Sequence, residues 1–159
     1  MSDSVRLEEG TLAPDFTLTD QNGTPFTLSS TRGQKTIVYF YGEAGTPACT
    51  NQACDFRDNM SVFDDAGYRV AGISRDEPSA NAAFAHDEKL PQVILSDPTR
   101  EVHEKYGTFG EKQLYGRTVT GVIRATFILD ADGVIEQALY NIKATGHVAM
   151  LLKKLRLAR

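Results

Sequence analysis

The sequence predicts an α/β domain in which helices flank a central mixed sheet, and three observations lead to this expectation. Short apolar runs rich in β-branched and aromatic residues alternate with helix-period segments along the chain. Two hairpin signals, Asn22-Gly23 and Asp130–Gly133, join neighbouring strands near the two ends. The length of 159 residues suits one hydrophobic core, so we expect a single domain over residues 1–159.

The N-terminal part reads as a hairpin followed by a buried strand. Phe16–Leu18 and Phe26–Leu28 alternate apolar and polar residues on either side of the Asn22-Gly23 turn. Lys35–Tyr41 is short and nearly continuously apolar, which is typical of a strand covered on both faces. An N-terminal β-hairpin extension and a central strand are therefore expected.

The middle of the chain alternates helices and strands. In the first predicted helix, apolar residues recur at helical spacing, at Ala53, Phe56, Met60 and Phe63. Gly67 is expected to end this helix. The following segments predict a buried strand, a helix, a short strand and a third helix, namely Tyr68–Ser74, Pro78–Lys89, Gln92–Leu95 and Thr99–Tyr106. A glycine-rich loop is expected from there through Gly121.

The C-terminal part reads as a second hairpin and a closing helix. Val122–Leu129 and Val134–Tyr140 are two strong strand patterns on either side of Asp130–Gly133. His147–Leu157 is amphipathic, and its cations near the C-terminal end suit the helix dipole. The helix therefore reads as a solvated surface helix.

Composition and charge exclude several classes of protein. Seventeen Lys and Arg against 21 Asp and Glu give a net charge of −4, and the pI of about 5.4 argues against binding to nucleic acid. The longest apolar runs, Ile37–Tyr41 and Val148–Leu152, are far shorter than the ~20 residues that span a membrane. Met1–Asp15 lacks the apolar core of a secretory signal. Two cysteines are too few for a disulfide-rich secreted scaffold, so a cytoplasmic protein with reduced thiols is expected.

Cys49 is the first candidate for chemistry. Thr46 suits the N-cap of a helix and Pro47 its first position, which places Cys49 in the first turn. The unpaired N–H groups and the positive end of the helix dipole favour a thiolate there, and the thiolate is the nucleophilic form of cysteine. The alternative is that Cys49 is a small buried hydrophobic residue.

Cys54 follows five residues later. In an intact helix the two Cα atoms lie about 8.5–9 Å apart, whereas a disulfide needs about 6.8 Å or less. A bond between the cysteines would therefore require the first turns to unwind, which favours a transient redox bond over a structural one. A metal site is not expected, because the histidines are scattered along the chain at His86, His103 and His147.

Arg124 is a permanent charge inside a predicted strand. A guanidinium near the buried part of a sheet needs an anionic partner, and a cysteine thiolate or the oxyanion formed when it reacts would be one. The alternative is an edge-strand arginine that points into water. Arg57, on the first helix, is expected to have a structural role at a solvated face.

The segment Gly45-Thr46-Pro47-Ala48-Cys49-Thr50, with Cys54 and the Phe56-Arg57-Asp58 that follows, resembles the peroxiredoxins, and more narrowly their bacterioferritin comigratory protein or peroxiredoxin Q branch. The likeness extends from Ala13-Pro14-Asp15-Phe16 to the C-terminal helix. This resemblance implies a thioredoxin-like three-layer fold with added N-terminal strands.

The resemblance also implies a thiol peroxidase. Cys49 would be the peroxidatic cysteine that attacks hydrogen peroxide or an organic hydroperoxide. Thr46 would orient thiolate and peroxide, and Arg124 would lower the thiol pKa and stabilise the departing oxygen. Cys54 would be the resolving cysteine, giving an intramolecular disulfide that thioredoxin or a similar thiol reductant opens. No metal, haem or flavin cofactor is implied, and a monomer, with at most a weak dimer, is expected.

One position departs from the family pattern. The family usually has proline where this chain has Gly42, seven residues before Cys49. Glycine admits more backbone conformations than proline, so a less rigid pocket is expected, with the same nucleophile.

Two other functions remain compatible with the motif. The first is a thioredoxin-like disulfide oxidoreductase, although that chemistry favours C-x-x-C and Gln52 stands three residues after Cys49. The second is a redox sensor that reports its oxidation state to a partner without efficient peroxide turnover.

Overall fold

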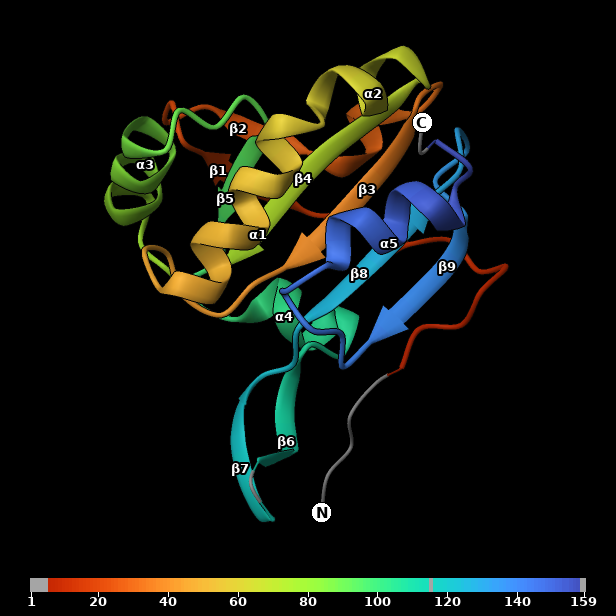
Figure 1. Ribbon diagram of the computed structural model, residues 1–159. Coiled ribbons are helices and arrows are strands. Elements are labelled where there is room, and N and C mark those ends of the chain that lie inside the picture. Colours follow the sequence, from red (N-terminus) through yellow and green to blue (C-terminus); the bar gives the residue numbers. More distant parts are fainter. Residues whose placement is uncertain (1–5, 115, 158–159) are drawn as a thin grey trace.

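A mixed sheet runs through the middle of the molecule in the computed structural model, which describes residues 6–114 and 116–157 (Figure 1). Its strand order is β2-β1-β5-β4-β3-β8-β9. β3, β4 and β5 are parallel, and the other neighbouring pairs are antiparallel. The predicted central mixed sheet flanked by helices is confirmed. No secretory signal was expected in residues 1–15. Residues 1–5 of this segment lie outside the described residues.

The helices and strands follow one another in the order expected of an α/β chain. They are β1 (Thr17–Asp20), β2 (Pro25–Thr27), a 3₁₀ turn η1 (Leu28–Thr31), β3 (Lys35–Phe40), α1 (Pro47–Asp58), α2 (Met60–Asp65), β4 (Tyr68–Ser74), α3 (Pro78–Asp87), β5 (Val93–Ser96), α4 (Glu101–Tyr106), β6 (Phe109–Leu114), β7 (Arg117–Val122), β8 (Ala125–Leu129), β9 (Ile135–Tyr140) and α5 (His147–Lys154).

The N-terminal hairpin is confirmed. β1 and β2 pair antiparallel, with Thr17 opposite Thr27. Gly23 has a φ of 79° in the turn, a conformation that glycine adopts without steric cost. Through β1 the hairpin pairs with β5 and so extends one side of the sheet.

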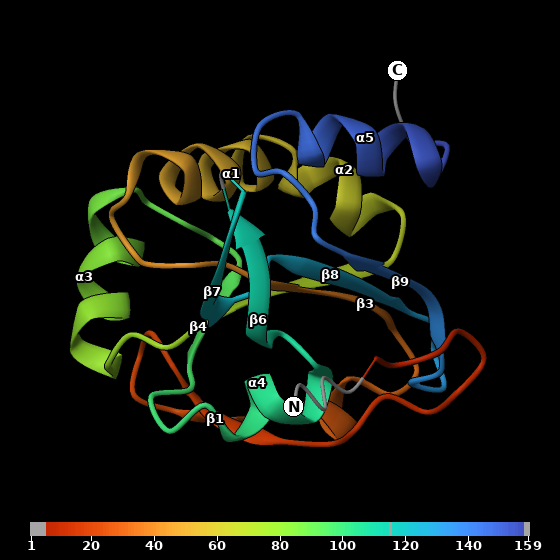
Figure 2. The ribbon, with the colours of Figure 1, turned by 90° about the horizontal axis from the view of Figure 1, so that it is seen from below.

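Two apolar layers cover the two faces of the sheet. Ile37 and Tyr39 of β3 point into a cluster with α1, α2, α3 and α5. Val38 and Phe40 point into a second cluster that includes residues of α4 and the N-terminal strands. Figure 2 shows α1, α2 and α5 on one side of the sheet and α4 on the other. The continuous apolar run of β3 therefore reflects burial on both faces, as predicted.

Tyr39 sets the distance of α1 from the sheet. Its ring stacks on Phe56 of α1, with ring centroids 4.4 Å apart. The same ring lies over Gly72 of β4, where an added Cβ would come within 2.5 Å of the Tyr39 ring. Only glycine fits there, so Gly72 allows the stacked rings of Tyr39 and Phe56 to pack against the sheet.

The first helix differs from its prediction. The apolar spacing from Ala53 to Phe63 predicts one helix, but the structure has α1 and α2 separated at Asn59, which has φ −116° and ψ 10°. The Asn59 side chain donates a hydrogen bond to the carbonyl of Asp55 at 2.8 Å. Side-chain bonds of this kind compete with helical bonding, and they are consistent with the break.

The expected loop through Gly121 is wrong, because β6 and β7 form an antiparallel hairpin there that projects from the body (Figure 1). Its strands are polar and contain glycine, which depresses strand propensity and hid them in the sequence. At its base, the guanidinium groups of Arg75 and Arg100 lie 5.0 Å and 4.5 Å from the ring centroid of Phe109. These cation–π contacts attach the hairpin to the loops after β4 and β5.

The C-terminal elements are shorter than predicted. β8 begins at Ala125 and not at Val122, which belongs to β7, and β9 begins at Ile135. α5 ends at Lys154 and not at Leu157. Within residues 6–114 and 116–157, no helix is long and apolar enough to cross a membrane.

His147 is a buried histidine that joins α5 to the sheet. Its Nε2 atom is 2.8 Å from the Thr126 hydroxyl of β8, and the residue is 2% exposed. Burial, with a smaller effect from the charge of Arg124, lowers the pKa of His147 from 6.5 to about 4. The folded protein therefore holds this imidazole neutral where the unfolded chain protonates it.

This difference predicts a loss of stability in acid. Between about pH 6.5 and 4 the unfolded chain binds a proton that the folded protein does not. The free energy of unfolding should therefore fall as the pH drops through this window, by up to about 1.4 kcal/mol per pH unit. Urea unfolding of wild type and His147→Gln across the window would measure it, and the variant should show a flatter dependence. His86→Gln, at an exposed histidine, is the control; equal slopes in all three proteins would contradict the assignment.

Candidate active site

The loop from Gly42 to Thr46 connects the carboxyl end of β3 to the start of α1. Gly45 has a φ of 85°, and Thr46 is extended, as the residue before a proline prefers. The Ala44 N–H donates to the carboxylate of Asp76, in the β4–α3 connection, at 2.8 Å. This hydrogen bond holds the loop against the connection that follows β4. Pro47 begins α1, as predicted.

Cys49 occupies the third position of α1. Cys49 is 3% exposed and belongs to the apolar cluster under the helix. Its Sγ atom nevertheless accepts a hydrogen bond from Nη2 of Arg124 at 3.0 Å. The reading of Cys49 as a purely apolar core residue does not account for a guanidinium directed at its sulfur.

Arg124 reaches Cys49 because of the pairing between β3 and β8. In this antiparallel pair Phe40 lies opposite Ala125, so the residue before Ala125 lies beside the start of the active-site loop. The sequence predicted that Arg124 lies inside a strand. In the structure it lies in the connection between β7 and β8. Its carbonyl accepts a hydrogen bond from the Ile142 N–H at 3.1 Å, which ties this connection to the segment after β9. The alternative of an arginine pointing into water is wrong.

Gln52 is a site residue that the sequence reading missed. It is 0% exposed, one turn after Cys49, and its Oε1 accepts a hydrogen bond from Nη1 of Arg124. One guanidinium nitrogen therefore donates to the sulfur and a second donates to the amide oxygen of Gln52. Together these two hydrogen bonds fix the plane of the guanidinium. The i, i+3 spacing of Cys49 and Gln52 is the signal that could have placed both on one helix face.

The surroundings of Cys49 favour its thiolate. Burial by itself raises the pKa of this thiol, but the nearby Thr46 hydroxyl, the Glu43 backbone and the guanidinium and charge of Arg124 lower it by more. The net effect is a pKa below the ordinary value of a cysteine. A lowered pKa in a cation-bearing site is the environment of a reactive cysteine.

Thr46 lies at the N-cap of α1, as predicted, but its side chain makes no capping bond to the helix. Its hydroxyl donates to the carbonyl of Glu43 at 2.8 Å. A hydroxyl carries one proton, so Thr46 can donate to this carbonyl or to a group at the sulfur, but not to both at once. To donate to a ligand that approaches Cys49, the hydroxyl must turn away from the Glu43 carbonyl.

Cys54 lies on a different face of α1. Both cysteines are free thiols, Cys49 buried and Cys54 partly buried. The Cys54 thiol donates to Oε1 of Glu88 at 3.4 Å. Partial burial and this carboxylate raise the pKa of Cys54, so the two thiols shift in opposite directions. Arg57 pairs with Asp58 at 2.9 Å and donates to the Glu88 carbonyl, which agrees with the structural role expected for it.

A pocket of about 690 Å³ opens above the Cys49 sulfur. Cations outnumber acids in its lining: Arg75, Lys112, Arg124 and Lys143 against Glu43. A Cβ added at Gly42 would lie 3.8 Å from the sulfur and 4.0 Å from Nη2 of Arg124, which is ordinary contact, and Gly42 does not have a positive φ. The backbone at Gly42 does not require glycine, and the missing side chain leaves space beside the sulfur.

The arrangement supports nucleophilic chemistry at a single sulfur. A thiolate at Cys49 can attack an electrophile in the pocket, and the Arg124 guanidinium is placed to stabilise negative charge that develops there. In the described part of the chain, no group of three or more His, Cys, Asp or Glu residues is arranged to hold a metal ion.

The chain is similar to proteins of known family. The sequence profile of the AhpC/TSA family matches residues 10–138. The putative peroxiredoxin Rv2521 of Mycobacterium tuberculosis is 53% identical over 155 residues, covering 98% of this chain and 99% of that protein. Peroxiredoxin Bcp of Escherichia coli is 43% identical over 150 residues, covering 94% and 96%. The structure of Xanthomonas campestris bacterioferritin comigratory protein, studied for alkyl peroxide reduction, superposes with a TM-score of 0.85 at 29% identity, over 94% and 98% of the two chains.

Removal of the guanidinium should reduce the reactivity of Cys49. Arg124→Ala deletes both the hydrogen bond to the sulfur and the nearby positive charge, so the pKa of the Cys49 thiol should rise. The pH dependence of alkylation by iodoacetamide, in a Cys54→Ser background, would show the shift as a move of the curve to higher pH.

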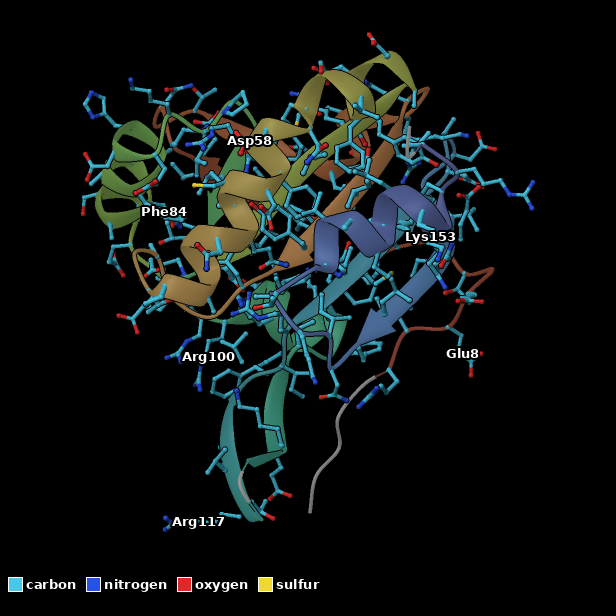
Figure 3. All side chains as sticks on the ribbon, viewed as in Figure 1. Glu8, Asp58, Phe84, Arg100, Arg117 and Lys153 are labelled. Atoms are coloured by element: carbon cyan, nitrogen blue, oxygen red, sulfur yellow. The ribbon has the colours of Figure 1, made fainter. Side chains whose placement is uncertain are left out.

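Arg117→Ala is the matched control, because Arg117 is an exposed arginine of the projecting hairpin, far from the helices (Figure 3). Its alkylation curve should coincide with that of the parent protein. An Arg124→Ala curve that also coincides would show that the guanidinium does not stabilise the thiolate.

Proposed function

Because this chain belongs to the AhpC/TSA family of peroxiredoxins, we propose that Cys49 is the residue that attacks its peroxide substrate. The resemblance to the peroxiredoxins and to their bacterioferritin comigratory protein branch is confirmed, as is the thioredoxin-like α/β fold. The protein is therefore a thiol peroxidase. We take residues 1–159 to be one domain of this kind.

The contact of Arg124 with Cys49 is the observation that carries the assignment. The Sγ thiolate attacks one oxygen of the peroxide, the O–O bond breaks, and the other oxygen leaves as hydroxide or alkoxide and takes up a proton. Nη2 of Arg124, at 3.0 Å from the sulfur, is positioned to stabilise the charge on the oxygens during this step. Thr46 would turn its hydroxyl from the Glu43 carbonyl toward the bound peroxide. Cys49 becomes a sulfenic acid.

Cys54 completes the cycle in this proposal. Its thiol condenses with the Cys49 sulfenic acid, releases water and leaves an intramolecular disulfide. In the intact helix the sulfurs contact different partners, Arg124 and Glu88, and an ideal helix keeps the Cα atoms about 8.5–9 Å apart. The segment from Thr50 to Ala53 must therefore unwind before the bond can form.

The substrates and the reductant follow from the same chemistry. We assign hydrogen peroxide and organic hydroperoxides as substrates; the Xanthomonas relative was studied for alkyl peroxide reduction. Thioredoxin or a similar dithiol would open the disulfide by exchange. We place the protein in the cytoplasm, where thiols stay reduced, as a monomer or a weakly associating dimer.

The alternative activities have less support from the site. A disulfide oxidoreductase would use a second cysteine three residues after Cys49, where Gln52 instead binds Arg124. A redox sensor would need no catalytic turnover. Peroxide-dependent NADPH oxidation with thioredoxin and thioredoxin reductase separates both from a peroxidase, because only a peroxidase consumes NADPH in proportion to added peroxide.

Replacement of the nucleophile should abolish this turnover. A serine hydroxyl at position 49 is hardly ionised at neutral pH, so Cys49→Ser should lose peroxidase activity to the background rate of the coupled assay. The circular dichroism spectrum of the variant should match that of wild type, because the two side chains have similar size. Turnover near the wild-type rate would end the assignment of Cys49.

Loss of the second thiol should trap the intermediate. One equivalent of peroxide should lower the mass of wild type by about two units as the disulfide forms, and raise that of Cys54→Ser by about sixteen as the sulfenic acid persists. With excess peroxide the variant should proceed to sulfinic acid. The oxidised wild type should also lose amide protection around Thr50–Ala53; equal protection in both oxidation states would contradict unwinding.

A further inference from the structure

Glu88 lies against the reacting atom of the second thiol, and the first half of the cycle does not use it. It follows the last residue of α3, at the C-cap. Its Oε1 accepts the hydrogen bond of the Cys54 thiol at 3.4 Å. Both residues are partly buried, so the contact is neither fully exposed to water nor sealed from it.

Two sets of hydrogen bonds hold Glu88 in place. The end of α3 is closed by bonds from the Glu88 N–H to the Phe84 carbonyl at 3.0 Å and from the Leu90 N–H to the Ala85 carbonyl at 2.9 Å. Nη1 of Arg57 donates to the Glu88 carbonyl at 2.7 Å. Arg57 follows Cys54 on α1, beyond the segment that must unwind. The contact between Glu88 and Cys54 can therefore persist while Cys49 moves toward it.

We propose that Glu88 is a catalytic residue of the resolving step, in which its carboxylate accepts the proton of the Cys54 thiol; the inference rests on the role proposed above for Cys54. The Sγ–H bond of Cys54 breaks as its proton passes to Oε1. The sulfur's electron pair forms the S–S bond with Cys49, the S–O bond of the sulfenic acid breaks, and the departing hydroxide takes a proton and leaves as water. Glu88 then returns its proton to solvent, so one thiol and one sulfenic acid give one disulfide and one water.

The charged and titratable groups around Cys54 leave Glu88 as the proton acceptor. Arg57 and Asp58 face it from α1, and Tyr39 faces it from β3. Asp58 is already paired with Nε of Arg57 at 2.9 Å, and Tyr39 is a buried phenol whose pKa is raised by burial. Among the described residues, Glu88 is the one whose side chain forms a hydrogen bond with the thiol.

The carboxylate has two effects of opposite sign on the rate of resolution. By raising the pKa of Cys54 it reduces the amount of free thiolate, which alone would slow disulfide formation. By accepting the proton during attack it removes the need for free thiolate, which accelerates the step, and general-base catalysis contributes roughly 10²–10⁴-fold. Neutralising Glu88 therefore distinguishes the two: resolution becomes faster if the carboxylate only repels the thiolate, and slower if it is the base.

Glu88→Gln is the variant that makes this distinction, because the amide keeps the size of the side chain and removes its charge. Protein treated with one equivalent of hydrogen peroxide would be quenched in acid at successive times, and the masses of the sulfenic acid and the disulfide would give the resolving rate. At about pH 6 we expect disulfide formation to be slowed at least tenfold. Between about pH 6 and 8 the variant's rate should rise close to tenfold per pH unit with the thiolate fraction, whereas the wild-type rate should change little.

Asp87→Asn is the matched control, since Asp87 is the neighbouring exposed carboxylate on α3 and pairs only with the exposed His86 among the described residues. Its resolving rate should equal that of wild type at every pH. A Glu88→Gln rate equal to or above the wild-type rate at about pH 6 would overturn the proposal. A wild-type protein that forms no disulfide would instead overturn the role of Cys54, so the two failures are distinguishable.

Discussion

The guanidinium of Arg124 joins two segments that are 75 residues apart in the chain, and the active site depends on this junction. One nitrogen binds the sulfur of Cys49 and the other binds the amide of Gln52. The sheet makes the junction possible, because antiparallel pairing of β3 with β8 aligns Phe40 with Ala125. The connection between β7 and β8, which ends at this pair, thereby places the charge at the start of α1. A thiolate and a guanidinium are each costly to desolvate, and each is the partner that the other requires.

Two chemically identical thiols acquire different properties from their partners. Cys49 faces a cation and hydrogen-bond donors, which favour its thiolate, whereas Cys54 faces a carboxylate, which favours its thiol. The helix that carries both keeps these surroundings separate, since five residues correspond to about 1.4 turns. In the peroxidase cycle proposed here, the order of the two oxidations follows from this separation. The same helix geometry makes local unwinding a necessary step between them.

The elements that were predicted well are those whose pattern is decided locally. The apolar run of β3, the Asn22-Gly23 turn and the Thr46-Pro47 helix start each depend on a few adjacent residues, and each is present in the structure. The β6–β7 hairpin was missed because its polar, glycine-containing strands are held at their base by Arg75 and Arg100, which come from distant loops. The break at Asn59 was missed because helical spacing continues across it.

The sequence by itself determined the family and pointed to Cys49 as the candidate nucleophile, because Thr46, Pro47 and Cys49 are close in the chain and the helix start places them together. It also determined that Cys54 cannot reach Cys49 in an intact helix, since that follows from helical rise and spacing alone. The partners of the two thiols were decided only by the tertiary structure. Arg124 is brought to one sulfur by strand pairing, and Glu88 is brought to the other by the end of α3 and its bond to Arg57. Hydrogen bonds of this kind depend on a few ångströms of packing between distant elements, and no local pattern of residues encodes that distance.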